Sequence, residues 1–438
     1  MAEANIKHVA IIPSPGMGHI IPFVELAKRL VDEHHLFTVT LIFSGESSPS
    51  RAQRSVLNSL PSSIDSVFLP PADLSDVPST ARLETRIMLT LTRSNPALRE
   101  LFSSLSTKKR LPAVLIVDLF GTDAFDVAAE FNVSPYIFFA SNANVLSFFL
   151  HMPKLDETVS CEFRYLTEPV EIPGCVPMTG KDFLDTPNAI KTLQEPAPDK
   201  PPVYPIGPLV NTDTSDVNVK DEESECLNWL DNQPYGSVLY VSFGSGGTLT
   251  TEQFNELALG LADSEKRFIW VIRSPSGIAS SSYLNPHSQT DPFTFLPLGF
   301  LDRTKERGLV IRSWAPQIQI LAHPSTCGFL THCGWNSILE SIVNGVPLIV
   351  WPLFAEQKMN ALLLVEDVGA ALRAQAGEDG IVGREEVVRV VKGLMEGEEG
   401  KAIGNKMKEL KEGAVRVLGD DGFSNKSFGE VLVKWKAH

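Results

Sequence analysis

Short apolar runs alternate with amphipathic stretches from the first residues of this 438-residue chain. Runs rich in Val, Ile, Leu and Phe are typical of strands that are buried on both faces of a parallel sheet. In the first part of the chain these runs are residues 8–13, 37–43, 66–69, 113–117 and 135–139. Helical patterns separate or follow them at residues 19–31, 50–60, 80–105, 122–131 and 143–155. This βαβα order predicts an α/β fold with a doubly wound parallel sheet.

A second series of the same kind follows an interruption. Residues 161–208 are rich in Pro and Gly and contain no convincing strand, and residues 211–225 are polar and acidic, which is typical of an exposed linker. The later strands are predicted at residues 237–243, 267–272, 308–312, 327–331 and 347–351. The later helices are predicted at residues 250–263, 318–322, 335–343, 356–366, 384–418 and 425–436. We therefore predict two doubly wound domains, 1–210 and 226–418, which face each other across a cleft.

The net charge and the lengths of the apolar runs restrict the classes of partner that the chain could bind. The chain has 38 Lys and Arg against 53 Asp and Glu, a net charge of −15, which argues against nucleic acid or an anionic membrane surface as the main partner. No apolar run reaches the roughly 18 residues that a membrane span needs, and the first residues do not resemble a secretion signal. We therefore expect a cytoplasmic protein without a membrane span. Five cysteines in so long a chain do not predict a disulfide framework.

A Gly-rich turn, Pro13 to His19, joins the first predicted strand to the first predicted helix. Ligands of open α/β sheets bind at the carboxyl ends of the strands, so this turn is a candidate binding loop. The dinucleotide fingerprint G-x-G-x-x-G is not met, because Ile21 stands where the third glycine would be. That mismatch argues against a nucleotide-dependent oxidoreductase.

His19 stands at the start of the first helix, where the helix dipole disfavours the imidazolium ion. Asp118 follows the strand 113–117 and is expected to open on the same crevice. A carboxylate bonded to one imidazole nitrogen fixes the tautomer and leaves the other nitrogen as a general base. Two structural alternatives stay open, a His19 that only caps or packs and an Asp118 that caps the next helix.

The chain offers this base no nucleophile of its own. A serine hydrolase would need a G-x-S-x-G elbow, and the nearest sequence, Gly244-Ser245-Gly246, lacks the spacing. We therefore expect the base to activate a group that is not part of the protein.

The densest signal lies in residues 314–357. A predicted strand runs into His332, and a helix begins just after it, so the helix-terminal amides with Asn336 and Ser337 form a candidate diphosphate site. Glu340 lies one turn further along the same helix face, where a carboxylate could accept hydrogen bonds from two vicinal sugar hydroxyls.

Further residues of this segment could contact a nucleobase and a sugar in addition to the diphosphate. Trp314 offers a flat face on which a base could stack. Glu356 and Gln357 follow a predicted strand, so they too are expected to point into the cleft and to contact hydroxyls. Together these features describe a pocket for a nucleoside-diphosphate sugar.

Each of these residues has a structural alternative. Trp314 and Trp335 could be core aromatics, and Glu340 could be a solvated helix residue. His332 between Cys327 and Cys333 could indicate a metal, but the spacing is poor for zinc.

Residues 314–357 resemble, over their full length, the signature box of the plant secondary-product UDP-glycosyltransferases. The turn PSPGMGH and the segment around Asp118 are also similar to that family, and the likeness extends over almost the whole chain. It is greatest to the hydroquinone/phenol glucosyltransferase branch. The resemblance implies the GT-B class, two Rossmann-like domains facing a cleft, with a helix in residues 419–438 that packs back on the first domain.

The resemblance also implies an activity. It predicts an inverting, metal-independent transfer of glucose from UDP-glucose, as co-substrate, to the hydroxyl of a small phenolic acceptor. No cofactor and no metal is expected, and the absence of any Asp-x-Asp sequence agrees with this expectation. A monomer is expected.

By the same resemblance, His19 is the base and Asp118 its partner. Trp314 is assigned to the uracil, Gln317 and Glu340 to the ribose, and Ala315 to the donor site in general. The diphosphate is assigned to Ser245, His332, Asn336 and Ser337. The sugar is assigned to Trp335, Glu356 and Gln357, where a final Gln favours UDP-glucose over UDP-galactose. The acceptor pocket is assigned to a largely apolar set, namely Glu84, Ile87, Phe120, Phe149 and Leu184.

The chain departs from the family pattern at one place. Between Asp185 and Pro187 family members carry a helix and an apolar strand, and here both are missing. The departure raises an alternative function, a catalytically impaired or inert isoform that binds UDP-sugar.

Overall fold

The computed structural model describes residues 7–32, 37–45, 51–58, 60–78, 81–159, 165–166, 168–172, 175, 177–179, 182, 202–210, 221–280 and 290–437. The chain forms two compact units. The first comprises Met1–Asn142, Thr186–Val210 and Leu418–His438, and the second comprises Ala143–Asp185 and Asn211–Val417.

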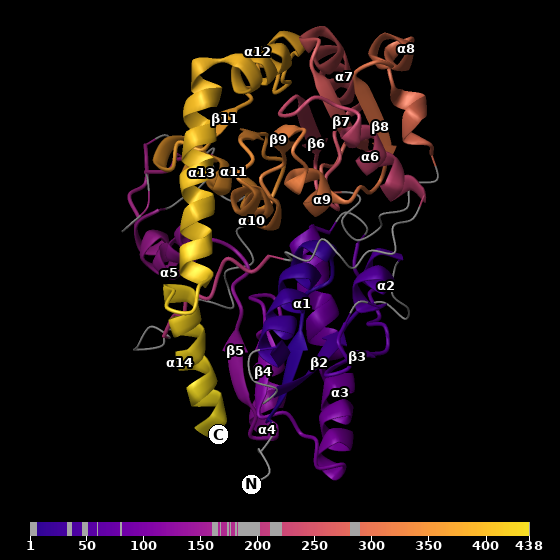
Figure 1. Cartoon of the computed structure of the whole chain (residues 1–438). Helices are drawn as coiled ribbons and strands as arrows, with labels where there is room; N and C mark the ends of the chain where they lie inside the picture. The colour runs from indigo at the N-terminus through magenta and orange to yellow at the C-terminus, as the bar shows by residue number, and fades with distance from the viewer. Residues whose placement is uncertain are drawn as a thin grey trace. The chain divides into compact units, whose positions relative to one another are not determined.

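The first unit is built on a five-stranded parallel sheet in the order β3-β2-β1-β4-β5 (Figure 1). Its strands are β1 (Lys7–Ile12), β2 (Phe37–Phe43), β3 (Ile64–Phe68), β4 (Val114–Val117) and β5 (Ser134–Ile137). The helices between them are α1 (Met17–Asp32), α2 (Arg51–Asn58), α3 (Leu83–Thr107) and α4 (Ala124–Glu130). Because β1 and β4 are buried along most of their length, their sequences are continuous apolar runs, as the parallel sheet requires.

The second unit is built on a six-stranded sheet in the order β11-β10-β9-β6-β7-β8, also parallel throughout. Its strands are β6 (Val238–Ser242), β7 (Arg267–Ile272), β8 (Gly308–Arg312), β9 (Thr326–Thr331), β10 (Leu348–Val350) and β11 (Ala371–Arg373). Its helices are α5 (Ala143–Thr158), α6 (Asp221–Asp231), α7 (Thr251–Ser264), α8 (Phe300–Thr304), α9 (Gln317–Ala322), α10 (Trp335–Asn344), α11 (Gln357–Leu362), α12 (Arg384–Glu396) and α13 (Glu398–Leu418). Two single turns, Pro292–Phe295 and Leu363–Asp367, complete it.

The structure differs from the predicted domain limits at two places. We predicted Ala143–Asp185 in the first domain, yet it clusters with the second unit, because α5 contacts α11 and the buried Asp182 forms an ion pair with Arg373. The predicted linker 211–225 overlaps α6, which begins at Asp221.

The predicted helix 384–418 is two helices in the structure. Gly397 lies between α12 and α13 in an extended conformation, and a Cβ there would stand 2.6 Å from the carbonyl oxygen of Gly393. The close approach explains why the chain turns at a glycine that the helical pattern alone does not reveal.

The last helix, α14 (Phe423–Ala437), belongs to the first unit. Its residues Phe428, Val431, Leu432 and Trp435 are buried in the same apolar cluster as the strands of the first sheet. The Trp435 ring packs edge-on against Tyr136, with 5.3 Å between ring centroids. Packing of this apolar face is what holds the helix on the unit.

A polar anchor on α1 also holds α14 and residues 202–210 of the same unit. Arg29 donates to the carbonyl of Ile206 at 2.7 Å and to the Asn425 side chain, and its guanidinium lies 4.3 Å from the centre of the Phe428 ring. Three separate stretches of sequence therefore meet at one side chain.

We expect Arg29→Ala to lower the free energy of unfolding by about 2 kcal/mol, because it removes charge-assisted hydrogen bonds from partners that are partly buried. Urea unfolding followed by circular dichroism measures this change. The control is Arg99→Ala, which breaks an exposed pair with Glu130 and is expected to change the same quantity by less than about 1 kcal/mol. Equal effects of the two variants would contradict an anchoring role for Arg29.

Among the described helices, none combines the length and the hydrophobicity that a membrane span requires.

Candidate active site

The first candidate site lies at the switch point of the first sheet. The strand order reverses between β1 and β4, and in open α/β sheets ligands bind at such a reversal, at the carboxyl ends of the strands. Ile12 pairs with Val117, so the turn after β1 and the residue after β4 are neighbours. Gly16 in this turn has φ 112°, a conformation that favours glycine.

His19 and Asp118 meet at this point. The Nδ1 atom of His19 lies 3.0 Å from Oδ2 of Asp118. The carboxylate, 3% exposed, also accepts hydrogen bonds from the Ser14 amide at 3.1 Å, the Ser14 hydroxyl at 2.7 Å and the Phe120 amide at 3.0 Å. Both carboxylate oxygens are therefore held by fixed donors, which orient the imidazole. The two alternatives in which these residues only cap or pack do not account for this contact.

The environment keeps Asp118 ionised. Burial opposes the charge, but the neighbouring His19 and the hydrogen bonds from His19 and Ser14 outweigh it and hold the pKa of Asp118 below its ordinary value. An ionised carboxylate beside Nδ1 places the imidazole proton on that nitrogen, so Nε2 is the atom that can take a proton. The geometry is that of an oriented general base.

Ser14 is a site residue that the sequence analysis missed. It holds Asp118 through both its backbone and its side chain and is fully buried. The signal available in the sequence was a small polar residue at the end of a buried strand, between Pro13 and Pro15.

The structure distributes the predicted acceptor residues over both units. Phe120 lies beside the base, with 5.7 Å between its ring centroid and that of His19. Glu84 is in the first turn of α3 and Ile87 is buried on the same helix. Phe149 is buried on α5 in the second unit. Leu184 lies outside the described residues.

The second candidate site lies at the switch point of the second sheet. There the order reverses between β6 and β9, and the residues that follow these strands are Phe243 to Ser245 and His332 to Gly334. Helix α10 begins at Trp335, directly after the loop that follows β9, so its N-terminus lies at this edge. A helix N-terminus at a switch point favours an anionic group such as a diphosphate.

Two glycines enclose the ring of His332. A Cβ on Gly244, which has φ 73°, would lie 2.3 Å from Cε1 of His332, and one on Gly334 would lie 2.5 Å from Nε2. The Nδ1 atom is buried and has no hydrogen-bond partner among the described residues. Burial, and secondly the charge of Arg273, lower the pKa of His332 to about 3, so the imidazole is neutral at neutral pH. It can offer a ligand a hydrogen bond but not a full charge.

The loop after β9 is strained and held from α11. Cys333 has φ 68°, which is unusual for a residue with a side chain, and its carbonyl accepts a hydrogen bond from the Asn360 side chain at 2.9 Å. Asn360 is fully buried. It is a second residue that the sequence analysis missed, because nothing local connects it to the loop.

Glu340, Gln317 and Ser337 form one hydrogen-bonded group. The Gln317 amide nitrogen donates to Glu340 at 2.6 Å and lies 3.0 Å from the Ser337 hydroxyl. Tyr240 donates to the Gln317 carbonyl oxygen at 3.3 Å. Glu340 is 7% exposed, so the alternative of a solvated helix residue is wrong.

The remaining donor candidates differ in exposure. Trp314 is 45% exposed and is not a core residue, whereas Ala315 is buried beside it. Trp335 packs partly against the core of the second unit. Ser245 is partly buried after β6, and Asn336 is partly buried in the first turn of α10.

Glu356 and Gln357 stand at the start of α11. The side-chain oxygen Oε1 of Gln357 accepts hydrogen bonds from the backbone amides of Leu353 at 2.8 Å and Phe354 at 3.0 Å. This end of the side chain therefore shapes the loop.

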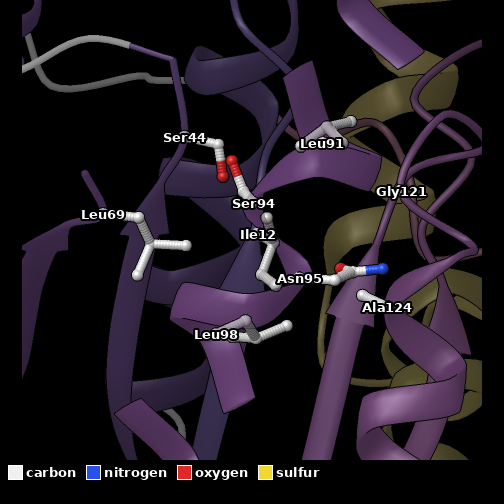
Figure 2. Close-up of a pocket in the computed structure, with 9 residues that line it drawn as sticks. All are labelled: Ile12, Ser44, Leu69, Leu91, Ser94, Asn95, Leu98, Gly121 and Ala124. Atoms are coloured by element: carbon white, nitrogen blue, oxygen red, sulfur yellow. The ribbon is translucent and has the colours of Figure 1, made fainter. Parts of the chain in front are cut away.

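A small cavity in the first unit is separate from these groups (Figure 2). It is lined by Ile12, Ser44, Leu69, Leu91, Ser94, Asn95, Leu98, Gly121 and Ala124. Figure 2 shows Ser44 and Ser94 turned toward one another. The cavity has room for about one water molecule, which is too little for a sugar or a phenol.

Within the part of the chain that the structure describes, no group of three or more His, Cys, Asp or Glu side chains is placed to hold a metal ion. The thiols of Cys327 and Cys333 instead face the carbonyls of Val238 and Thr331.

Comparison with known proteins identifies the family. The profile of the family described as "UDP-glucoronosyl and UDP-glucosyl transferase" matches residues 202–408. The chain is 77% identical to UDP-glycosyltransferase 72B2 of Arabidopsis thaliana, over 100% of this chain and 98% of the relative. It is 53% identical to the hydroquinone glucosyltransferase of Rauvolfia serpentina, over 99% and 98%. The alignment with the Arabidopsis relative has 472 positions against 438 residues in this chain.

Solved structures of plant enzymes also match the chain. A UDP-glucosyltransferase from Polygonum tinctorium matches with a TM-score of 0.89 at 49% identity, over 99% of this chain and 100% of that one. The Phytolacca americana enzyme UGT2, solved with UDP-2fluoro-glucose and pterostilbene, matches with a TM-score of 0.86 at 46% identity, over 99% and 100%. The predicted GT-B class with two Rossmann-like domains is confirmed. The chain belongs to the plant UDP-glycosyltransferase family and is a glycosyltransferase.

Proposed function

We propose that this enzyme transfers glucose from UDP-glucose to the hydroxyl of a small phenolic acceptor, with inversion at the anomeric carbon and without a metal. The observation that carries the proposal is the buried Asp118 carboxylate, fixed by Ser14, at 3.0 Å from Nδ1 of His19. This arrangement supports His19 as the base for a hydroxyl that comes from outside the protein.

The reaction is a single displacement. The acceptor hydroxyl gives its proton to Nε2 of His19 as its oxygen attacks C1 of glucose, and the bond from C1 to the UDP oxygen breaks. Asp118 stabilises the imidazolium that forms, and UDP leaves with the bonding electrons. The α-linked sugar of UDP-glucose then yields a β-glucoside, because attack comes from the face opposite the leaving group.

The second unit would hold the donor. We assign the uracil to Trp314 with Ala315 beside it, the ribose to Gln317 and Glu340, and the diphosphate to Ser245, His332, Asn336 and Ser337. Trp335, Glu356 and Gln357 would contact the sugar. The amides at the start of α10, with the neutral His332 as a donor, would stabilise the charge that develops on UDP.

The relatives support the acceptor class. One is named for hydroquinone, a phenol, one is described as capable of glucosylating indoxyl, and one was solved with pterostilbene. Phe120 beside His19 offers an aromatic ring an apolar neighbour. The comparisons do not support the alternative of an inert isoform. Residues 183–201 lie outside the described residues, so the missing helix and strand stay a prediction.

The test is to incubate the purified protein with a panel of phenols and either UDP-glucose or UDP-galactose, and to follow products by mass. We expect phenol hexosides with UDP-glucose and markedly slower formation with UDP-galactose. Absence of product with every phenol, in a preparation that still binds UDP, would reject the proposal.

We expect Glu340→Ala to weaken UDP-glucose binding about tenfold or more, because a buried acceptor of ribose hydrogen bonds is lost. Isothermal titration calorimetry measures this affinity. Glu398→Ala is the control, since Glu398 is exposed and pairs only with Lys401 on its own helix among the contacts described. Unchanged affinity in the Glu340 variant would remove it from the ribose site.

A further inference from the structure

The end of β7 is central in the second sheet, yet it has no part in the donor site as assigned. Ser245 follows β6, Trp314 follows β8 and His332 follows β9. The order β9-β6-β7-β8 places the end of β7 between those of β6 and β8. The residue at that position is Arg273, which immediately follows β7.

Arg273 holds the loop that carries Trp314. Its guanidinium Nη2 donates to the carbonyl of Ser313 at 2.6 Å, and the amide of Ser313 donates to the carbonyl of Ile272 at 2.9 Å. Both backbone groups of Ser313 are therefore fixed by the end of β7. Ser313 needs this support, because its φ of 60° is one that residues with side chains rarely adopt.

The indole of Trp314 is only partly covered by packing. It is 45% exposed, whereas Ala315, which follows it, is buried. The direction of Trp314 thus depends on the backbone of Ser313, and through that backbone on Arg273.

Arg273 differs from the ion-paired arginines of this unit. Arg312 pairs with Asp291, Arg303 with Asp263 and Arg384 with Glu256. Within the described residues no carboxylate pairs with Arg273. Burial lowers its pKa to about 10, so it keeps its charge at neutral pH. The described partner of this guanidinium is a backbone carbonyl in a strained turn, so Arg273 supports that turn instead of an ion pair.

We propose that Arg273 is a positioning residue for the donor site, which fixes Ser313 so that the face of Trp314 stands ready for the uracil ring. This inference rests on the proposed function, because it takes Trp314 as the uracil platform. It assigns Arg273 a role in uridine affinity and none in the displacement itself.

The test compares the affinity for UDP, measured by calorimetry, with the affinity for uridine, measured by the displacement of bound UDP by uridine. Arg273→Gln is expected to weaken both ligands by the same factor, about tenfold, the loss of one charge-assisted hydrogen bond. Arg273→Lys, which can still donate to the Ser313 carbonyl, is expected to recover part of that loss. In turnover assays the KM for UDP-glucose rises by the same factor and kcat stays within about twofold.

A double-mutant cycle with Trp314→Ala makes the test specific. If Arg273 acts through the indole, Arg273→Gln adds little to the loss already caused by Trp314→Ala. Arg312→Gln is the matched control, because it removes a neighbouring arginine whose side chain contacts Asp291 and Phe293 instead of Ser313. It is expected to leave both affinities unchanged, and thermal unfolding verifies that each variant is folded.

Three results would overturn the inference. The first is that the losses of affinity in the double-mutant cycle are additive. The second is that Arg273→Gln loses affinity for UDP but not for uridine, which would place the guanidinium on the diphosphate. The third is that Arg273→Gln binds both ligands with wild-type affinity. Failure of the wild-type chain to bind UDP at all would instead reject the proposed function.

Discussion

His19→Ala is expected to lower kcat by about 10²- to 10⁴-fold, the range that a positioned general base contributes. The expectation follows from the 3.0 Å contact between Nδ1 of His19 and Asp118, which leaves Nε2 to take the proton of the acceptor. The dissociation constant of UDP is expected to change by less than about twofold, because all residues assigned to the donor lie in the second unit. Steady-state kinetics with hydroquinone and calorimetry with UDP measure the two quantities.

The chain provides a matched control for this variant. His323 also faces a carboxylate, with 3.2 Å between its Nε2 and Asp231, but it stands at the opposite end of β9 from His332. His323→Ala is expected to leave kcat unchanged. Turnover of His19→Ala near that of the wild type would refute the assigned base.

Gly244→Ala is expected to weaken UDP binding by about 10- to 100-fold. A Cβ at this position would stand 2.3 Å from Cε1 and 2.4 Å from Nε2 of His332, so the ring has to move. Overpacking of this kind costs about 1–3 kcal/mol, which converts to roughly that range of affinity if the ring can no longer reach the diphosphate.

Gly299→Ala separates this clash from backbone strain. Gly299 has the same φ of 73° as Gly244, but nothing lies within 4 Å of a Cβ there. Both variants therefore carry the cost of a left-handed alanine, about 1 kcal/mol. Only Gly244→Ala also displaces the ring. Equal UDP affinities in the two variants would contradict a role for His332 in the donor site.

The sequence predicted the two parallel sheets because their central strands are nearly uniform apolar runs. Strands such as Val114–Val117 and Val238–Ser242 are buried at every position, so their hydrophobicity alone marks them. Ala371–Arg373 was missed, because three residues are too few to establish a pattern. The placement of Ala143–Asp185 depends on the contact between α5 and α11 and on the Asp182–Arg373 pair, which no local pattern reveals.

Part of the candidate site could also be predicted, from the order of strands and helices in the sequence. His19 and Asp118 could be expected to meet, because the carboxyl ends of parallel strands converge at one edge. The residues that support the loops of the two candidate sites could not be found in this way. Ser14, Asn360 and Arg273 act through contacts with residues distant in sequence or through backbone atoms, and their residue types carry no distinctive signal.

The central claim is that the chain moves glucose from UDP to a phenol with inversion and without a metal. The most direct measurement is to mix the purified enzyme with UDP-glucose, hydroquinone and excess EDTA, and to follow the anomeric proton by NMR. We predict a β-glucoside that accumulates as UDP is released, at the rate seen without EDTA. An α-glucoside, or a rate that EDTA abolishes and added Mg²⁺ or Mn²⁺ restores, would contradict the account.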